Sequence, residues 1–243
     1  MRIKSILLSI SIVAAISGGA AHAATNLVAN GQFNLTTNGT NKQLASSPTT
    51  AADRSTLTGW TSSNGNDGGY NFVLDSAIAN TYNSAIWLKG DSGLLPNTGN
   101  IFASDSQYYP GTLSQTISGL TVDNAYTLTF SYALAQQVGF TGANVDNYWQ
   151  VGFGNATRGS GALSIADGGF SGWKTATMTF TASSASQALS FLAQGSSPGA
   201  TPFMLLDNVS LTAAVPEPST WGMMLGGIGL VGFLARRRAA KQA

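Results

Sequence analysis

Apolar and polar residues alternate one by one along several short stretches of this chain, and no stretch before Pro216 keeps a helical period. From Tyr126 to Leu134 every second residue is aromatic or leucine, and the residues between them are threonine, serine or alanine. This alternation places apolar side chains on one face of a β-strand and small or polar ones on the other. The pattern therefore predicts a series of strands that each turn one face towards a core.

Further strands are predicted at 113–117, 148–153, 175–181, 189–191 and 203–211, whereas residues 40–110 are less regular. Turn-forming pairs such as Asn30-Gly31 and Ser118-Gly119 separate the strands. Short strands without long helices favour an all-β fold. We therefore expect residues 24–214 to form one antiparallel, jelly-roll-like β-sandwich.

The N-terminus has the three zones of a secretory signal. Arg2 and Lys4 precede the apolar stretch Ile6–Ile16, and Ala21 and Ala23 supply small residues for a signal peptidase. The sequence predicts a signal peptide over residues 1–23, so the domain that follows is exported.

The C-terminus, residues 215–243, combines a short proline-rich segment, an apolar run from Trp221 to Leu234 and a basic cluster. The proline-rich segment is Pro216-Glu217-Pro218, and the cluster is Arg236-Arg237-Arg238. A helix of 14 residues would span about 21 Å, less than the ~30 Å hydrocarbon core of a bilayer. The arginines are a cytoplasmic marker, so we expect a short transmembrane helix at about 221–235 that stops at them.

This tail resembles the PEP-CTERM sorting signals of Gram-negative bacteria in the order and spacing of its three parts. The resemblance implies that an exosortase recognises Pro216, Glu217 and Pro218 as the sorting motif. It also implies an address in the cell envelope, on the cell surface or in the extracellular matrix, with at least transient membrane anchoring. Proteins of that family are often linked to exopolysaccharide and biofilm matrix.

Composition excludes several kinds of function. The chain has no cysteine, its one histidine is His22, and its one glutamate is Glu217. The domain between signal and tail therefore has no imidazole or thiol for a Ser-His-Asp triad, a Cys nucleophile or a His/Cys zinc site. Its five basic and nine acidic side chains give a formal net charge of −4, which disfavours nucleic acid as a partner. Two aspartates acting as a glycosidase pair remain an alternative to a non-enzymatic domain.

Residues 26–212 also resemble the galactose-binding-like jelly rolls found in many carbohydrate-binding modules. The resemblance rests on Asn30-Gly31-Gln32-Phe33, Gly59-Trp60, Leu113–Ile117, Tyr126–Phe130, Gly172-Trp173 and Leu206–Leu211. It implies a core position for Trp60 and Trp173. It also implies that Asp207 is a ligand of a structural calcium, although Asn34 stands where the family usually has an acidic residue. The alternative role for Asp207 is to accept hydrogen bonds from nearby backbone amides.

Sugar binding uses aromatic faces together with amide and carboxylate groups. The candidates for such contacts are Tyr108 and Tyr109, which precede Pro110, and Tyr148 with the nearby Asp146. Asn64–Tyr70 forms either a ligand-gripping loop or an ordinary surface loop. No catalytic residue and no cofactor other than calcium is predicted.

The sequence thus predicts a non-enzymatic surface or matrix protein that binds, or is embedded in, extracellular polysaccharide. The main alternative is a purely structural surface protein with protein partners and no glycan ligand.

Overall fold

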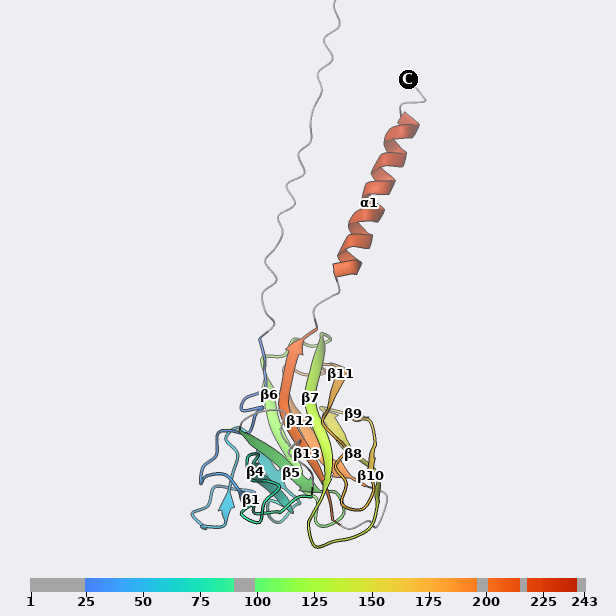
Figure 1. Cartoon of the computed structure of the whole chain (residues 1–243). Coiled ribbons are helices and arrows are strands. Elements are labelled where there is room, and N and C mark those ends of the chain that lie inside the picture. Colours follow the sequence, from blue (N-terminus) through green and yellow to red (C-terminus); the bar gives the residue numbers. More distant parts are fainter. Residues whose placement is uncertain (1–24, 90–98, 196–200, 215–217, 240–243) are drawn as a thin grey trace, which may run out of the picture.

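The computed structural model describes residues 25–89, 99–195, 201–214 and 218–239. Two β-sheets pack face to face, and one helix follows the last strand (Figure 1). The predicted signal peptide at 1–23 lies outside the described residues, as do Pro216 and Glu217 of the sorting motif.

One sheet has seven strands in the order β11-β7-β13-β5-β4-β1-β2. All its neighbours are antiparallel except β1 and β2, which are parallel. Its strands are β1 (Lys42–Leu44), β2 (Arg54–Ser55), β4 (Asn71–Asp75), β5 (Asn100–Asp105), β7 (Ala125–Gln136), β11 (Lys174–Thr181) and β13 (Pro202–Ala213).

The other sheet has six strands in the order β10-β8-β12-β6-β3, and β9 also pairs with β8. Its strands are β3 (Thr61–Ser63), β6 (Thr112–Ser118), β8 (Asn144–Phe153), β9 (Ala156–Gly159), β10 (Leu163–Ile165) and β12 (Ser186–Gln194). From β5 onwards the chain passes repeatedly from one sheet to the other. This two-sheet arrangement confirms the predicted jelly-roll-like β-sandwich, and strands lie at every stretch where alternation predicted one.

The main core lies between the two sheets. Trp149 of β8 is fully buried, and its ring centroid lies 5.8 Å from that of Phe102 on β5. Phe191 of β12 contacts Phe130 of β7 at 5.2 Å, in an edge-to-face arrangement. Such pairs add to the stabilisation from apolar burial alone. The aromatic side chains of four strands therefore hold the sheets together, and Trp60 is buried among them as expected.

A second apolar cluster covers part of the outer face of the seven-stranded sheet. It joins Leu74, Ala103 and Phe203, from three neighbouring strands, to Ile86 and Leu88 of the segment between β4 and β5. Trp173 is half-buried against this cluster and not in the core between the sheets. The seven-stranded sheet is therefore buried on both faces near β4 and β5, where the candidate site also lies.

The helix α1 (Pro218–Ala239) covers the residues for which a transmembrane segment was predicted at about 221–235. In the part of the chain that the structure describes, however, no helix is long and apolar enough to cross a membrane. The apolar run is short, five glycines interrupt it, and the arginines follow directly. The expected helix is present at these residues, and a transmembrane span at about 221–235 stays a prediction.

Candidate functional site

Two loops meet at one end of the sandwich because each connects one of two paired strands in one sheet to one of two paired strands in the other. Residues 64–70 connect β3 to β4, and residues 106–111 connect β5 to β6. β4 pairs with β5 in one sheet, and β3 pairs with β6 in the other. The two connections must therefore run side by side. This brings the predicted loop Asn64–Tyr70 next to the predicted ligand residues Tyr108 and Tyr109.

Glycines let the two loops touch through their backbones. A Cβ on Gly69 would lie 2.7 Å from Cα of Gly111, and a Cβ on Gly111 would lie 2.6 Å from the carbonyl oxygen of Gly68. Neither position has room for a side chain. The backbone amide of Tyr70 donates to the carbonyl oxygen of Tyr109 at 2.7 Å, which locks the two loops together.

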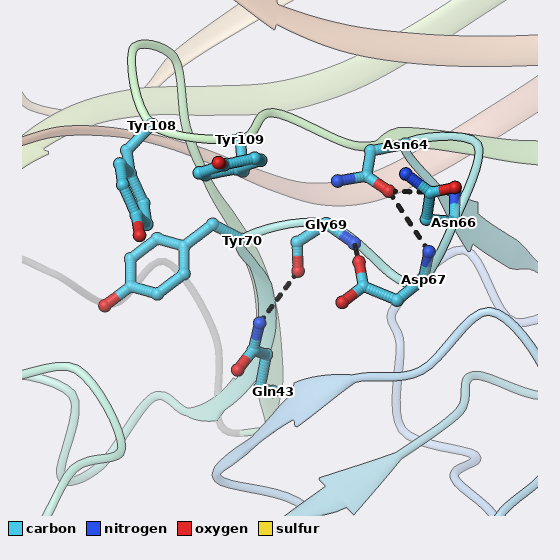
Figure 2. A pocket seen from close by; sticks show the side chains of 8 residues that line it. All are labelled: Gln43, Asn64, Asn66, Asp67, Gly69, Tyr70, Tyr108 and Tyr109. Carbon is cyan, nitrogen blue, oxygen red and sulfur yellow. Dashed lines mark hydrogen bonds between the residues drawn. The ribbon is translucent and has the colours of Figure 1, made fainter.

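Hydrogen bonds also fix the shape of the first loop (Figure 2). Oδ1 of Asn64 accepts from the backbone amides of Asn66 and Asp67 at 3.2 and 3.1 Å. Oδ1 of Asp67 accepts from the amide of Gly69 at 2.8 Å, and Nε2 of Gln43 on β1 donates to the carbonyl oxygen of Gly69 at 2.9 Å. These are the side chain–backbone bonds that shape turns. The polar side chains of the site are therefore held in place before any ligand arrives.

Three tyrosines form the aromatic part of the site. The ring of Tyr108 lies edge-to-face against Tyr70, with centroids 5.1 Å apart, and edge-to-face against Tyr109, at 4.7 Å. Tyr108 and Tyr109 are 57% and 63% exposed, so parts of both rings face solvent. Tyr109 has a φ of 46°, in the left-handed region that is uncommon for a bulky residue. Such strain persists where the surrounding structure enforces it, and here the bonded loops do so.

Together these residues line an open depression of about 420 Å³, here called the tyrosine depression. Its lining residues are Gln43, Asn64, Asn66, Asp67, Gly69, Tyr70, Tyr108 and Tyr109 (Figure 2). Aromatic faces can stack on the C–H faces of a sugar, while amides and a carboxylate can bind its hydroxyls. The depression thus combines the two kinds of group that a glycan ligand requires.

Asp105 is hydrogen-bonded to the backbone of Tyr108 and was not predicted from the sequence. It is almost fully buried at the end of β5, and its Oδ1 accepts from the amides of Gln107 and Tyr108 at 2.8 and 3.1 Å. Burial raises the pKa of Asp105 to about 6, although these two hydrogen bonds lower it. The pKa of Tyr70 is also raised, first by burial and then by the negative charge of Asp105. An Asp side chain that accepts hydrogen bonds from the backbone amides two and three residues further along the chain is a known turn motif. Asp105, with Gln107 and Tyr108, has this spacing.

Asp146 and Tyr148 do not join the tyrosine depression. Both lie on β8, in the six-stranded sheet. The backbone amide of Asp146 donates to Oγ of Ser164, and the ring of Tyr148 lies over Gly159 of β9, 3.4 Å from the position of a Cβ there. These two candidates are therefore not among the residues that line the depression, and their role in ligand binding stays a prediction.

The segments that the jelly-roll resemblance linked to calcium do meet. The amide of Val209 donates to the carbonyl oxygen of Gly31 at 2.9 Å. Asp207 is buried, and Asn208 donates to both of its carboxylate oxygens, through the backbone amide at 2.7 Å and Nδ2 at 3.3 Å. Oδ1 of Asn34 accepts from the amide of Asn100.

Calcium takes six to eight oxygen ligands, which can be carboxylates, backbone or amide carbonyl groups and waters. Among the described residues, no group of three or more His, Cys, Asp or Glu side chains could hold a metal ion. Calcium at Asp207 stays a prediction.

In the C-terminal tail the helix begins at Pro218, the last residue of the predicted sorting motif. The membrane-stop arginines Arg236, Arg237 and Arg238 all fall within α1. The guanidinium of Arg237 lies 5.5 Å from the centroid of the Phe233 ring, one helical turn earlier. Its positive charge can interact there with the face of the ring.

The comparisons with known proteins agree with the tail prediction. Residues 214–238 match the PEP-CTERM protein-sorting motif, which includes both the proline segment and the arginines. This motif indicates export and sorting to the cell envelope by an exosortase. No curated protein matches the chain.

Similar solved structures include carbohydrate-binding modules. A CBM61 module in complex with beta-1,4-galactotriose is 14% identical, with a TM-score of 0.44, and the match covers 79% of this chain and 100% of that one. A CBM4 structure is 15% identical, with a TM-score of 0.32, over 76% of this chain and 99% of the other. The CBM6 module of a laminarinase from Zobellia galactanivorans is 11% identical, with a TM-score of 0.29, over 58% and 98% of the two chains. These sequence identities and TM-scores are too low for the ligands of those proteins to indicate a ligand of this chain.

Proposed function

We propose that this protein is an exported, exosortase-sorted component of the cell surface or biofilm matrix whose β-sandwich binds extracellular polysaccharide at the tyrosine depression. The observation that carries the proposal is the depression itself. Two exposed tyrosine rings stand opposite an amide- and carboxylate-bearing loop, and both are fixed by backbone contacts. A pre-ordered site loses little conformational entropy when a ligand binds.

The sorting motif supports the location, because it directs the domain to the compartment in which polysaccharide is secreted. Among the residues that line the depression, Asp67 is the one carboxylate, and it can accept hydrogen bonds from sugar hydroxyls.

The test is glycan binding by the purified full chain, measured by calorimetry and on immobilised polysaccharides. We expect saturable binding that Tyr109→Ala weakens about tenfold or more, because the stacking surface is lost. Val122→Ala is the matched control, since Val122 is also exposed but lies in the turn before β7. A chain that binds no glycan, or binds equally with and without the Tyr109 ring, would contradict the proposal and favour a structural protein with protein partners.

A further inference from the structure

A second depression adjoins the tyrosine depression and shares Tyr70 and Tyr108 with it. It has a volume of about 430 Å³ and is lined by Tyr70, Asp105, Tyr108, Gln137, Phe140 and Thr201. Phe140 is 44% exposed, so part of its ring faces solvent. We call this the Phe140 depression.

The two depressions are neighbours because Tyr70 and Tyr108 line both of them. These two rings, which lie edge-to-face, are here called the Tyr70–Tyr108 ridge. A ligand that extends from the tyrosine depression past them reaches the Phe140 depression, which adds a third aromatic side chain, Phe140, to the lining.

Among the residues that the structure describes, no cationic side chain lines either depression. Asp67 lines the first, and Asp105 lines the second. Lys89 lies close to the second, where its Nζ donates to the carbonyl oxygen of Phe140, but it also forms an ion pair with Asp167 at 3.3 Å. A glycan carrying carboxylate, sulfate or phosphate groups would therefore meet like charge along the path, without a free cation to offset it.

Asp105 lines the Phe140 depression but is only 1% exposed, so it acts on a ligand through its negative charge and not through direct contact. The hydroxyls of an uncharged sugar can bond instead to the side-chain amide of Gln137 and to the hydroxyls of Tyr108 and Thr201, which line the same depression.

We propose that the two depressions form one groove that binds an uncharged oligosaccharide chain lying across the Tyr70–Tyr108 ridge. This inference rests on the proposed function and adds two statements to it. The ligand is long enough to occupy both depressions, and it carries no acidic groups.

The experiment compares short and long, neutral and acidic ligands on the full chain. The probes are disaccharides and hexasaccharides of β-linked glucan, galactan and mannan, and hexasaccharides of the same chains oxidised at C6 to the uronate. We expect the neutral hexasaccharide of at least one series to bind more tightly than its disaccharide and than its oxidised form. Raising the salt concentration will reduce the difference in affinity between the neutral hexasaccharide and its oxidised form, because salt screens the repulsion between the uronate groups and the aspartates.

Variants separate the two halves of the groove. Phe140→Ala will weaken binding of the neutral hexasaccharide about three- to tenfold and leave the disaccharide unchanged. Tyr109→Ala will weaken binding of both, and Val145→Ala, at another exposed apolar residue, will change neither. Thermal melts will show that each variant is folded.

The outcomes distinguish the two proposals. Binding of neutral disaccharides and hexasaccharides with equal affinity, and with no effect of Phe140→Ala, would overturn the extended groove while the tyrosine site stands. Uronate chains that bind as tightly as neutral ones would overturn the charge selection. A failure of every glycan to bind would remove the proposed function itself.

Discussion

Replacing Asp105 with asparagine should stabilise the protein at alkaline pH. Burial raises the pKa of Asp105 from 3.8 to about 6, so the folded state disfavours the charged carboxylate. Asparagine has nearly the same shape, and its Oδ1 can still accept from the amides of Gln107 and Tyr108. The substitution removes the buried charge and keeps the turn.

The magnitude follows from the pKa shift. Each pKa unit is worth 1.36 kcal/mol, so the charged form of Asp105 costs the fold about 3 kcal/mol at pH 8. Between pH 3.8 and about 6 the folded state binds more protons than the unfolded state, so the stability of the native chain falls as pH rises through this window. Above pH 6 the free-energy cost of the charged Asp105 no longer changes with pH, and at pH 4 this cost is below about 1 kcal/mol.

The assay is thermal unfolding of the native chain and the Asp105→Asn variant at pH 8 and pH 4. For a domain of this size 1 kcal/mol shifts Tm by ~2–4 °C, so we expect a gain of roughly 6–12 °C at pH 8 and a much smaller one at pH 4. Asp123→Asn is the control, because Asp123 is exposed and has a positive φ that asparagine also tolerates. Equal Tm values at pH 8, or a less stable variant, would show that the carboxylate has a favourable partner and refute the reasoning.

Three further predictions concern the site, the core and the metal. Gly111→Ala should weaken glycan binding and lower Tm, because its Cβ would collide with the carbonyl oxygen of Gly68; unchanged affinity would show that the loops separate freely. Trp149→Phe should cost about 2–4 kcal/mol in urea unfolding, because it leaves a cavity and frees the buried carbonyl oxygen of Leu205, and a loss under ~1 kcal/mol would contradict this. If the Asp207 carboxylate only bonds to Asn208, calcium and EDTA should give Tm values within about 1 °C of each other, and a larger stabilisation by calcium would support the predicted metal site.

The long strands could be predicted from the sequence because their alternation extends over enough residues to be recognised. β7 carries four core side chains at every second position from Tyr126 to Tyr132. The strands β1, β2 and β3 could not, because two or three residues are too few to show an alternation. These strands form because each pairs with another strand, as Gln43 on β1 pairs in parallel with Arg54 on β2, and such pairing leaves no local pattern in the sequence.

The candidate site was predicted in pieces. Tyr108, Tyr109 and the loop Asn64–Tyr70 were recognised by residue type, but their meeting depends on which strands pair, and no local signal shows that. Asp146 and Tyr148 were likewise recognised by residue type, and their role in ligand binding stays a prediction. Asp105 was missed because burial, not residue type, gives it a raised pKa.

The position of β13 has a consequence for how the chain folds during export. This strand is the last of the sandwich, yet it lies inside the seven-stranded sheet, hydrogen-bonded to β7 on one side and β5 on the other. It ends at Ala213, one residue before the match to the sorting motif begins. A chain that crosses the membrane N-terminus first therefore has a gap at the centre of that sheet until its last strand arrives. The strand that completes the sheet and the sorting motif are thus consecutive in the chain, so a chain truncated before β13 would lose the fold together with its address.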